Sequence, residues 1–215
     1  MIVSLSLMQH RPDISIDEFR RHWLDPHGVM TAELPNVRRY VQGHIVDSPA
    51  SNALAKSLNL AGFAVLSFDT IEDRQQAYTS PRIRECDKDS EEFVGAVSRV
   101  VTESRVVVDP PERDDLAKVY LLKVGPGGED SEWSDNVEAR VTKLPGVCGY
   151  VRHSVRSQAG APGSKVPILD LPVAAVAEAW FDSEAALMKS AGDLAGAGGD
   201  PGSTAVYVAR DHRLV

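Results

Sequence analysis

Side chains suited to moving protons gather between residues 23 and 44 of this 215-residue chain. A histidine, whose unperturbed pKa is about 6.5, can act as a general acid or base near neutral pH, and His27 lies in this stretch. A tyrosine hydroxyl can orient a carbonyl oxygen or stabilise an enolate, and Tyr40 follows. The sequence therefore predicts His27 and Tyr40 as catalytic residues. The alternatives are a core histidine bonded to a carbonyl and a tyrosine kept for packing.

The same stretch occurs twice. Trp23–Val41 returns in degraded form as Trp133–Val151, and seven of the 19 paired positions are identical. An internal repeat of this kind predicts two similar halves. Tyr40 is kept as Tyr150, which favours a shared structural duty, whereas His27 has no histidine counterpart. At most one of the two expected pockets can use that histidine.

Local patterns predict a helix that carries His27. Ser15 and Glu18 form a capping box, so a helix is expected to start there. Trp23 and His27 then fall at helical spacing on its buried stripe. Pro26 removes a backbone donor and crowds the preceding turn, so the helix should break beside His27.

The next predicted strand, Val37–Val46, has two different faces because side chains alternate along a strand. Val37, Val41 and Ile45 share one face, and the other carries Tyr40, Gln42 and His44. A face of this kind looks at water or at a polar pocket. We therefore expect these three side chains to line a cavity.

The second half offers a different polar pair. Glu178 and Trp180 alternate with Phe181, so they face the cavity if Phe181 faces the helices. By the repeat, Ser67 stands in the first half where Trp180 stands in the second. The ligand-binding residues that these patterns predict are Trp23, Gln42, His44, Ser67, Tyr150, Glu178 and Trp180.

Each half reads as βαββαβ, an α+β pattern of the ferredoxin-like type. In the first half, helical segments are expected to run to about Ser98, ahead of a fourth strand at Arg105–Val108. A sheet with helices on one face leaves its other face bare. We therefore predict that two ferredoxin-like repeats, residues 1–109 and 117–215, pack sheet to sheet around a barrel-like interior. Residues 110–116 are the expected linker.

Composition limits the possible partners. The net charge of −8 gives no cationic excess for nucleic acid or an anionic membrane surface. Cys86 and Cys148 are far apart, which fits free thiols in a reducing compartment, and we expect a cytoplasmic protein. His22 and His27 are five residues apart and diverge on a helix, so no metal site is predicted.

The residues from Ser15 to Gly28, followed by Leu34–Gln42, resemble the signature of the EthD family of the dimeric α/β-barrel superfamily, and residues 177–183 resemble its third-strand motif. The family's usual unit dimerises to build the barrel, so the resemblance implies that dimer fused into one chain, either monomeric or as a further homodimer. In the family's lactone isomerases, a helix-end histidine and a strand-two tyrosine are the proposed pocket residues, and they match His27 and Tyr40. The proline before His27 departs from the family pattern.

These observations predict an enzyme that needs no cofactor and uses histidine and tyrosine acid–base chemistry. Its expected substrate is a small cyclic or aromatic metabolite, such as a lactone or a polyketide, and the resemblance implies an isomerase or lyase. Two alternatives stay open. One is a binding or stress-related module without catalysis, and the other is an oxidoreductase or monooxygenase of the same superfamily.

Overall fold

The computed structural model describes residues 1–113, 115–125, 131–158, 164–200 and 202–215. Its strands are β1 (Ile2–His10), β2 (Arg39–Ile45), β3 (Gly62–Phe68), β4 (Val94–Val108), β5 (Ala117–Val124), β6 (Val147–Gln158), β7 (Val173–Phe181) and β8 (Thr204–Arg213). Its helices are α1 (Ile16–His22), the π-helical turn η1 (Trp23–His27), α2 (Gly28–Ala32), α3 (Ala53–Leu58), α4 (Ile71–Thr79), α5 (Pro81–Ser90), α6 (Ser131–Val141), α7 (Glu184–Lys189) and α8 (Ala191–Gly196).

The strands close into a single antiparallel barrel in the order β1-β3-β2-β8-β5-β7-β6-β4. Strands β1–β4 and β5–β8 repeat the same ferredoxin-like order, and the halves join through hydrogen bonds at the seams β2–β8 and β4–β6. The predicted pair of ferredoxin-like repeats around a barrel interior is confirmed. Edge pairing, rather than face contact alone, closes the barrel, and closure removes the free edges that an open sheet exposes.

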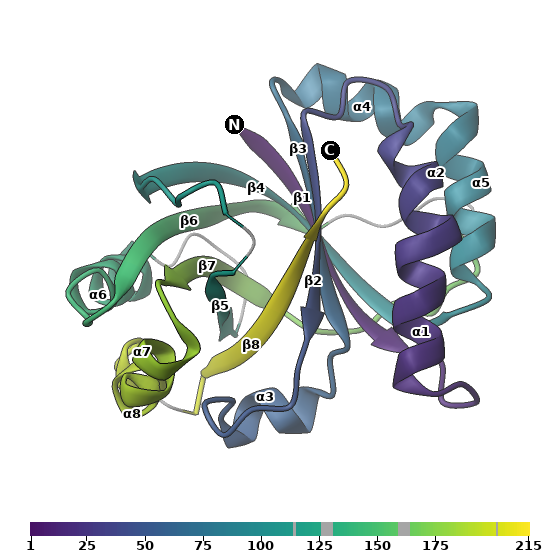
Figure 1. Ribbon diagram of the computed structural model, residues 1–215. Helices are drawn as coiled ribbons and strands as arrows, with labels where there is room; N and C mark the ends of the chain where they lie inside the picture. Colours follow the sequence, from purple (N-terminus) through teal and green to yellow (C-terminus); the bar gives the residue numbers. More distant parts are fainter. Residues whose placement is uncertain (114, 126–130, 159–163, 201) are drawn as a thin grey trace.

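Helices cover the outside of the barrel (Figure 1). α1, α2, α4 and α5 group outside the first half, α6, α7 and α8 lie outside the second, and α3 lies at one end. The capping box at Ser15 and Glu18 starts α1 as expected. The predicted break is also present, because Asp25 leaves helical geometry at φ −151° and ψ 119°, the extended region that a residue before proline prefers.

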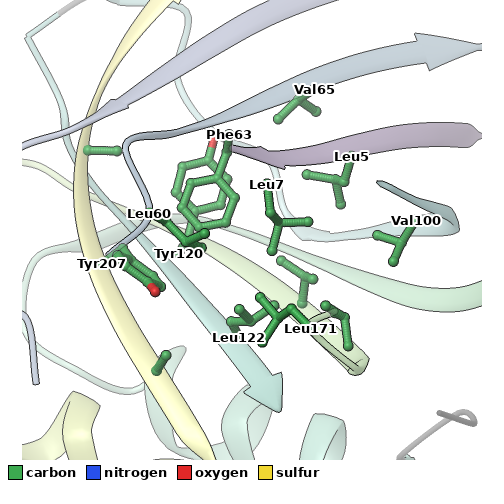
Figure 2. Packing of buried hydrophobic residues seen from close by; sticks show 14 of the residues in the cluster. Leu5, Leu7, Leu60, Phe63, Val65, Val100, Tyr120, Leu122, Leu171 and Tyr207 are labelled. Carbon is green, nitrogen blue, oxygen red and sulfur yellow. The ribbon is translucent and has the colours of Figure 1, made fainter. Parts of the chain in front are cut away.

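Three apolar clusters hold these layers together. One fills the barrel and takes residues from both halves, including Leu5, Phe63 and Tyr120 (Figure 2). The other two lie between the barrel and its helices. One of them surrounds Trp23 in the first half, and the other surrounds Trp133 in the second. Because both faces of these strands pack against side chains, polar residues on either face are largely buried.

The fourth strand is longer than the sequence predicted. Helix α5 ends at Ser90 and β4 already begins at Val94, so the prediction of helix to about Ser98 is wrong. Val94, Val97, Val100 and Val101 are all buried, and β-branched side chains of this kind pack well on a pleated surface. The long strand lets β4 pair with β1 and with β6 across the seam.

No helix in the described part of the chain is long and apolar enough to cross a membrane.

Candidate functional site

The polar face of β2 does not look into the barrel, and the expectation that Tyr40, Gln42 and His44 line the interior is wrong. Val41 takes the interior position, while Tyr40 packs in the helix-side cluster with Trp23. The physical reason is that the polar groups on this face bond to η1 and to one another. Gln42 Nε2 donates to the Trp23 carbonyl at 2.7 Å and to the Tyr40 hydroxyl at 2.8 Å.

His44 completes this helix-side network. Its Nε2 lies 3.0 Å from Gln42 Oε1, and its ring stacks on Trp23 at 4.6 Å between centroids. Since an amide oxygen only accepts, His44 donates from Nε2. Burial raises the pKa of Tyr40 far above its ordinary value, so its hydroxyl stays protonated. The three side chains therefore stabilise the junction of η1 with β2.

His27 lies on the same side of the sheet as Tyr40, beside α5. Its side chain is about 10% exposed, and its Nδ1 lies 2.9 Å from Asp89 Oδ2. His22 Nε2 contacts the same carboxylate at 3.1 Å. No hydrogen bond joins His27 to Tyr40 among the residues that the structure describes.

The other predicted ligand-binding residues divide between the two sides of the barrel wall. Tyr150 packs on the helix side of the second half, so its expected place in the cavity is also wrong. Ser67 is buried, and it shares the interior face of β3 with Val65 and Phe63. Glu178 and Trp180 lie on the interior face of β7, because Phe181 packs on the helix side.

A buried charge cluster surrounds Glu178 inside the barrel. Lys118 Nζ lies 2.5 Å from Glu178 Oε2 and 2.7 Å from Asp211 Oδ2, and it donates to the Tyr120 hydroxyl at 2.8 Å. His153 Nε2 lies 2.7 Å from Glu178 Oε1. These contacts join β5, β6, β7 and β8 in one network. A buried ion pair is stable only when its remaining donors and acceptors are also hydrogen-bonded. Here Lys118 uses all three N–H donors of its ammonium group.

Asp211 is the member of this charge cluster whose bonding is incomplete. Its Oδ2 accepts from Lys118, while its Oδ1 is buried and has no hydrogen-bond partner. The side chain as a whole is about 25% exposed, so one oxygen points into the protein while part of the residue meets open space. An unpaired buried acceptor costs free energy and marks a place where a ligand can donate.

A cavity of about 760 Å³ adjoins the charge cluster at one end of the barrel, here called the barrel-end cavity. The starts of β2 and β5 lie at that end, and so do the ends of β4, β7 and β8. Residues on either side of position 114 also line the cavity. Its walls include Arg39, Val41, Lys118, Val151, Trp180 and Asp211. The volume lies within the range of about 300–1,000 Å³ typical of small-molecule sites.

The two carboxylates of the charge cluster differ in acidity. Burial by itself would raise the pKa of Glu178, but the Lys118 charge and the His153 hydrogen bond outweigh it and hold that pKa well below its usual range. Burial raises the pKa of Asp211, and although Lys118 opposes this, Glu178 adds to it. Glu178 is therefore a fixed negative charge, and Asp211 is the better proton acceptor.

The charge cluster belongs to the second half alone. The strand registers place Val3 and Val65 of the first half where Lys118 and Glu178 stand in the second. Lys118, Asp211 and His153 were missed by sequence reasoning. A usable signal existed for Lys118, which alternates with Tyr120 and Leu122 along a strand that is otherwise apolar on that face. Asp211 gave no such signal because the sequence predicts the last strand only over Thr204–Ala209.

The described residues contain no group of three or more His, Cys, Asp or Glu side chains placed to hold a metal ion. What the barrel-end cavity offers is an unpaired carboxylate oxygen, the Arg39 guanidinium and the Trp180 ring. These groups can accept a proton, stabilise an oxyanion and pack against a flat apolar body.

Comparison with known proteins finds a family match within the first half of the chain and a shared fold for the whole. Residues 11–96 match the sequence model of the EthD domain, and no curated protein matches the chain. A solved anthrone oxidase-like protein superposes with a TM-score of 0.64 at 13% identity, over 99% of this chain and 93% of that one.

Two further solved structures are candidate monooxygenases. The one from Fusobacterium nucleatum subsp. nucleatum ATCC 25586 has a TM-score of 0.58 at 8% identity and covers 98% of this chain and 91% of its own. The one from Lactobacillus acidophilus NCFM has a TM-score of 0.53 at 10% identity and covers 100% and 94%. At these identities the likeness shows the fold alone, a dimeric α/β barrel, which is built here within one chain.

Proposed function

We propose, from the premise that residues 11–96 are an EthD domain within a two-repeat α/β barrel, that this protein is an enzyme that shifts a proton on a small cyclic or aromatic metabolite. The substrate would bind in the barrel-end cavity and would carry a carbonyl group. The sequence suggested an isomerase or a lyase, and the reaction proposed here is of the isomerase type. The proposed acid–base residue is a carboxylate of the barrel rather than His27.

The unpaired Oδ1 of Asp211 carries this proposal. A general base needs a free lone pair within reach of the substrate and a pKa closer to the working pH than that of an exposed carboxylate. Asp211 has a free lone pair on Oδ1, the residue lines the cavity that would hold the substrate, and its raised pKa meets the second condition. Its other oxygen is held by Lys118, which fixes the orientation of the carboxylate.

Arg39 and Trp180 suit the remaining requirements of the reaction. The Arg39 guanidinium lines the same cavity and is close enough to Asp211 to lower its pKa slightly, so it can donate to a developing enolate oxygen. Trp180 is 6% exposed and offers a ring against which a planar substrate can pack. Lys118 has no donor left for the substrate, because all three of its N–H groups contact Glu178, Asp211 and the Tyr120 hydroxyl.

The proposed step is a shift of one hydrogen along a conjugated carbonyl compound. Asp211 Oδ1 takes the proton from the carbon next to the carbonyl, and the electron pair of that C–H bond forms an enolate whose oxygen accepts from Arg39. The protonated Asp211 then returns the proton to a more distant carbon of the conjugated system. Atoms and charge balance without any co-reactant.

Proton abstraction can be tested without knowing the natural substrate. The protein is incubated in D₂O with an unsaturated five-membered lactone and with 1-tetralone, and deuterium incorporation next to the carbonyl is followed by mass spectrometry. We expect the wild type to accelerate incorporation for at least one probe. Asp211→Asn should slow it by about 100-fold or more, since general-base catalysis contributes 10²–10⁴-fold.

Asp193→Asn serves as the matched control, because Asp193 is exposed on α8, outside the barrel. It should leave the rate unchanged. Equal rates in the wild type and Asp211→Asn would remove Asp211 from the mechanism. Incorporation no faster than in buffer for every probe would favour the binding module that the sequence left open.

A second candidate base is His27, and one observation favours it. A carboxylate can only accept, so Asp89 orients His27 with its proton on Nδ1, which leaves Nε2 as the basic nitrogen. Tyr40 lies in the same layer, although its hydroxyl already accepts from Gln42. His27→Gln in the same exchange assay separates the two candidates, because only the residue that takes the proton should cost about 100-fold.

An oxidative reaction is the other outcome to measure, since solved proteins of the same fold are described as anthrone oxidase-like or as monooxygenases. Oxygen uptake with 1-tetralone as the probe tests it directly. Uptake that depends on the protein would replace the proton shift as the function of the barrel-end cavity.

A further inference from the structure

A second cavity, of about 380 Å³, lies where β1 and β2 end, and it shares the lining residue Val46 with the barrel-end cavity. The end of β1, the end of β2, helix α1 and the segment around α3 enclose it, and Tyr207 reaches it from β8. We call it the α3 cavity. Its apolar side is formed by Ile16, Ile45, Ala55, Leu60 and Ala61. Figure 2 shows Tyr207 next to Leu60 at the edge of the barrel core.

Three buried polar atoms without a hydrogen-bond partner belong to residues of this cavity. They are the hydroxyl of Tyr207, Nε of Arg20 and Oγ of Ser51, out of five such side-chain atoms in the described residues. Tyr207 is only 2% exposed. Buried polar groups in native proteins almost always have a hydrogen-bond partner. Three unpaired groups on residues of one cavity therefore indicate that a bound molecule supplies the missing partner. All three groups can donate, and Arg20 Nε can do nothing else, so a single partner shared by the three must be an acceptor.

The position of Arg20 is fixed by the protein. Its Nη2 donates to the Ile45 carbonyl at 2.6 Å, and its Nη1 lies 3.6 Å from Asp17 at the exposed side. The Nε–H is therefore the donor left over beside the cavity. Because the guanidinium is always charged, an acceptor placed at Nε is best an anion.

The charges around the α3 cavity agree with an anion. Arg20 and Lys56 contribute two positive charges, and Asp47 contributes one negative charge. His10 also lines the cavity, and its Nδ1 lies 2.7 Å from the Arg11 carbonyl, so Nδ1 is the protonated nitrogen. The lining of the α3 cavity therefore carries a net positive charge next to an apolar surface.

From these observations we infer that the α3 cavity is a second binding site, which takes a small carboxylate with an apolar body. One carboxylate oxygen would accept from Arg20 Nε, and the Tyr207 and Ser51 hydroxyls would donate to the carboxylate as well. A volume of about 380 Å³ suits one ring or a short aliphatic chain. The inference does not depend on the reaction proposed for the barrel-end cavity.

Binding of benzoate to the full-length protein, measured by titration calorimetry, tests the inference. Wild type should bind benzoate at least tenfold more tightly than benzamide, its neutral analogue, since the site selects a negative charge. Tyr207→Phe removes only the hydroxyl and should weaken benzoate binding about tenfold, and Arg20→Gln should weaken it more.

Two controls keep the result specific. Arg21→Gln removes an exposed charge next to Arg20 and should leave the affinity unchanged. Asp211 does not line the α3 cavity, so Asp211→Asn should also leave the affinity unchanged. Without ligand, Tyr207→Phe should be as stable as wild type or slightly more stable, because its hydroxyl makes no hydrogen bond to lose.

Three outcomes would overturn the inference. The first is no measurable benzoate binding, in which case water alone satisfies the three atoms. The second is equal affinity in wild type and Tyr207→Phe. The third is binding that is lost on Trp180→Phe and kept in Tyr207→Phe, which would place benzoate in the barrel-end cavity.

Discussion

Asp211 is the single residue on which the proposed chemistry depends, and its raised pKa has a measurable consequence. A base works only when deprotonated, so catalysed deuterium exchange should fall as the pH drops through the pKa of Asp211. Burial and the neighbouring Glu178 raise that pKa, so the midpoint should lie above about 4, the value of an exposed aspartate. The pH profile of exchange, corrected for unfolding by circular dichroism, measures it. A rate that stays flat down to pH 4 would contradict the assignment.

Substitution of Gln42 is a second single-residue test, and it addresses the helix-side network of Tyr40, Gln42 and His44. Gln42 is fully buried and holds the Trp23 carbonyl, the Tyr40 hydroxyl and His44. Gln42→Ala leaves these groups unpaired and should lower the free energy of unfolding by about 2–4 kcal/mol. Urea unfolding measures the change. Gln75→Ala, at an exposed site on α4, should stay within about 0.5 kcal/mol. A small effect at Gln42 would show that water replaces its bonds.

The strand face that each site residue occupies was predictable from the sequence to different degrees. Glu178 and Trp180 stand where alternation with Phe181 placed them, because Phe181 is unambiguously apolar. Tyr40 was assigned to the wrong face, because its polar neighbours suggested a cavity when they in fact bond to η1. A single strand with both faces buried gives no local signal for which face is the interior.

Among the elements, β2 and β8 form one of the two seams that join the halves, and two imidazoles meet there. His44 and His212 lie 4.4 Å apart between ring centroids. Burial, then the neighbouring His212 charge, lowers the pKa of His44 to about 3, and burial lowers the pKa of His212. Both rings are therefore held neutral in the folded state.

This seam should weaken in acid. The unfolded chain, whose histidines have pKa values of about 6.5, binds more protons than the folded one between pH 6.5 and 3, so stability falls as the pH falls through that window. His44→Phe keeps a ring on Trp23 and removes one titrating group. Between pH 7 and 4.5 the wild type should lose about 2 kcal/mol more than this variant. Chemical unfolding at both pH values measures the difference. Equal losses would mean that His44 titrates normally.

Element boundaries were harder to predict than element types. The capping box at Ser15 and the break at Pro26 are local in sequence, and both were correct. The start of β4 was not, because the residues before it continue a polar helical pattern, and the pairing that fixes the strand comes from β1 and β6. Tertiary contacts decided that boundary.

For the molecule as a whole, closure of one barrel by two seams predicts cooperative unfolding. The interior cluster takes residues from both halves, so neither half can unfold without exposing the core of the other. Scanning calorimetry should show one transition whose calorimetric and van't Hoff enthalpies agree. Two separate transitions would mean that the halves are independent domains. The boundaries 1–109 and 117–215 stay predictions about sequence units.

The repeat made this architecture predictable, since two βαββαβ units with bare sheet faces have few ways to bury them. The asymmetry of the interior was less predictable. Val3 and Val65 preserve an apolar lining in the first half, whereas Lys118 and Glu178 make the second half charged. The pairing of these charges depends on four strands meeting at one end of the barrel, which no local pattern reveals.

The most direct test of the account is the position of a bound lactone. A crystal of the protein soaked with a saturated five-membered lactone, which cannot isomerise, should show the molecule against Trp180 with its carbonyl toward Arg39 and its ring carbon beside Asp211 Oδ1. A lactone bound beside His27, near η1 and α5, or bound in the barrel-end cavity away from Asp211, would contradict the proposed site.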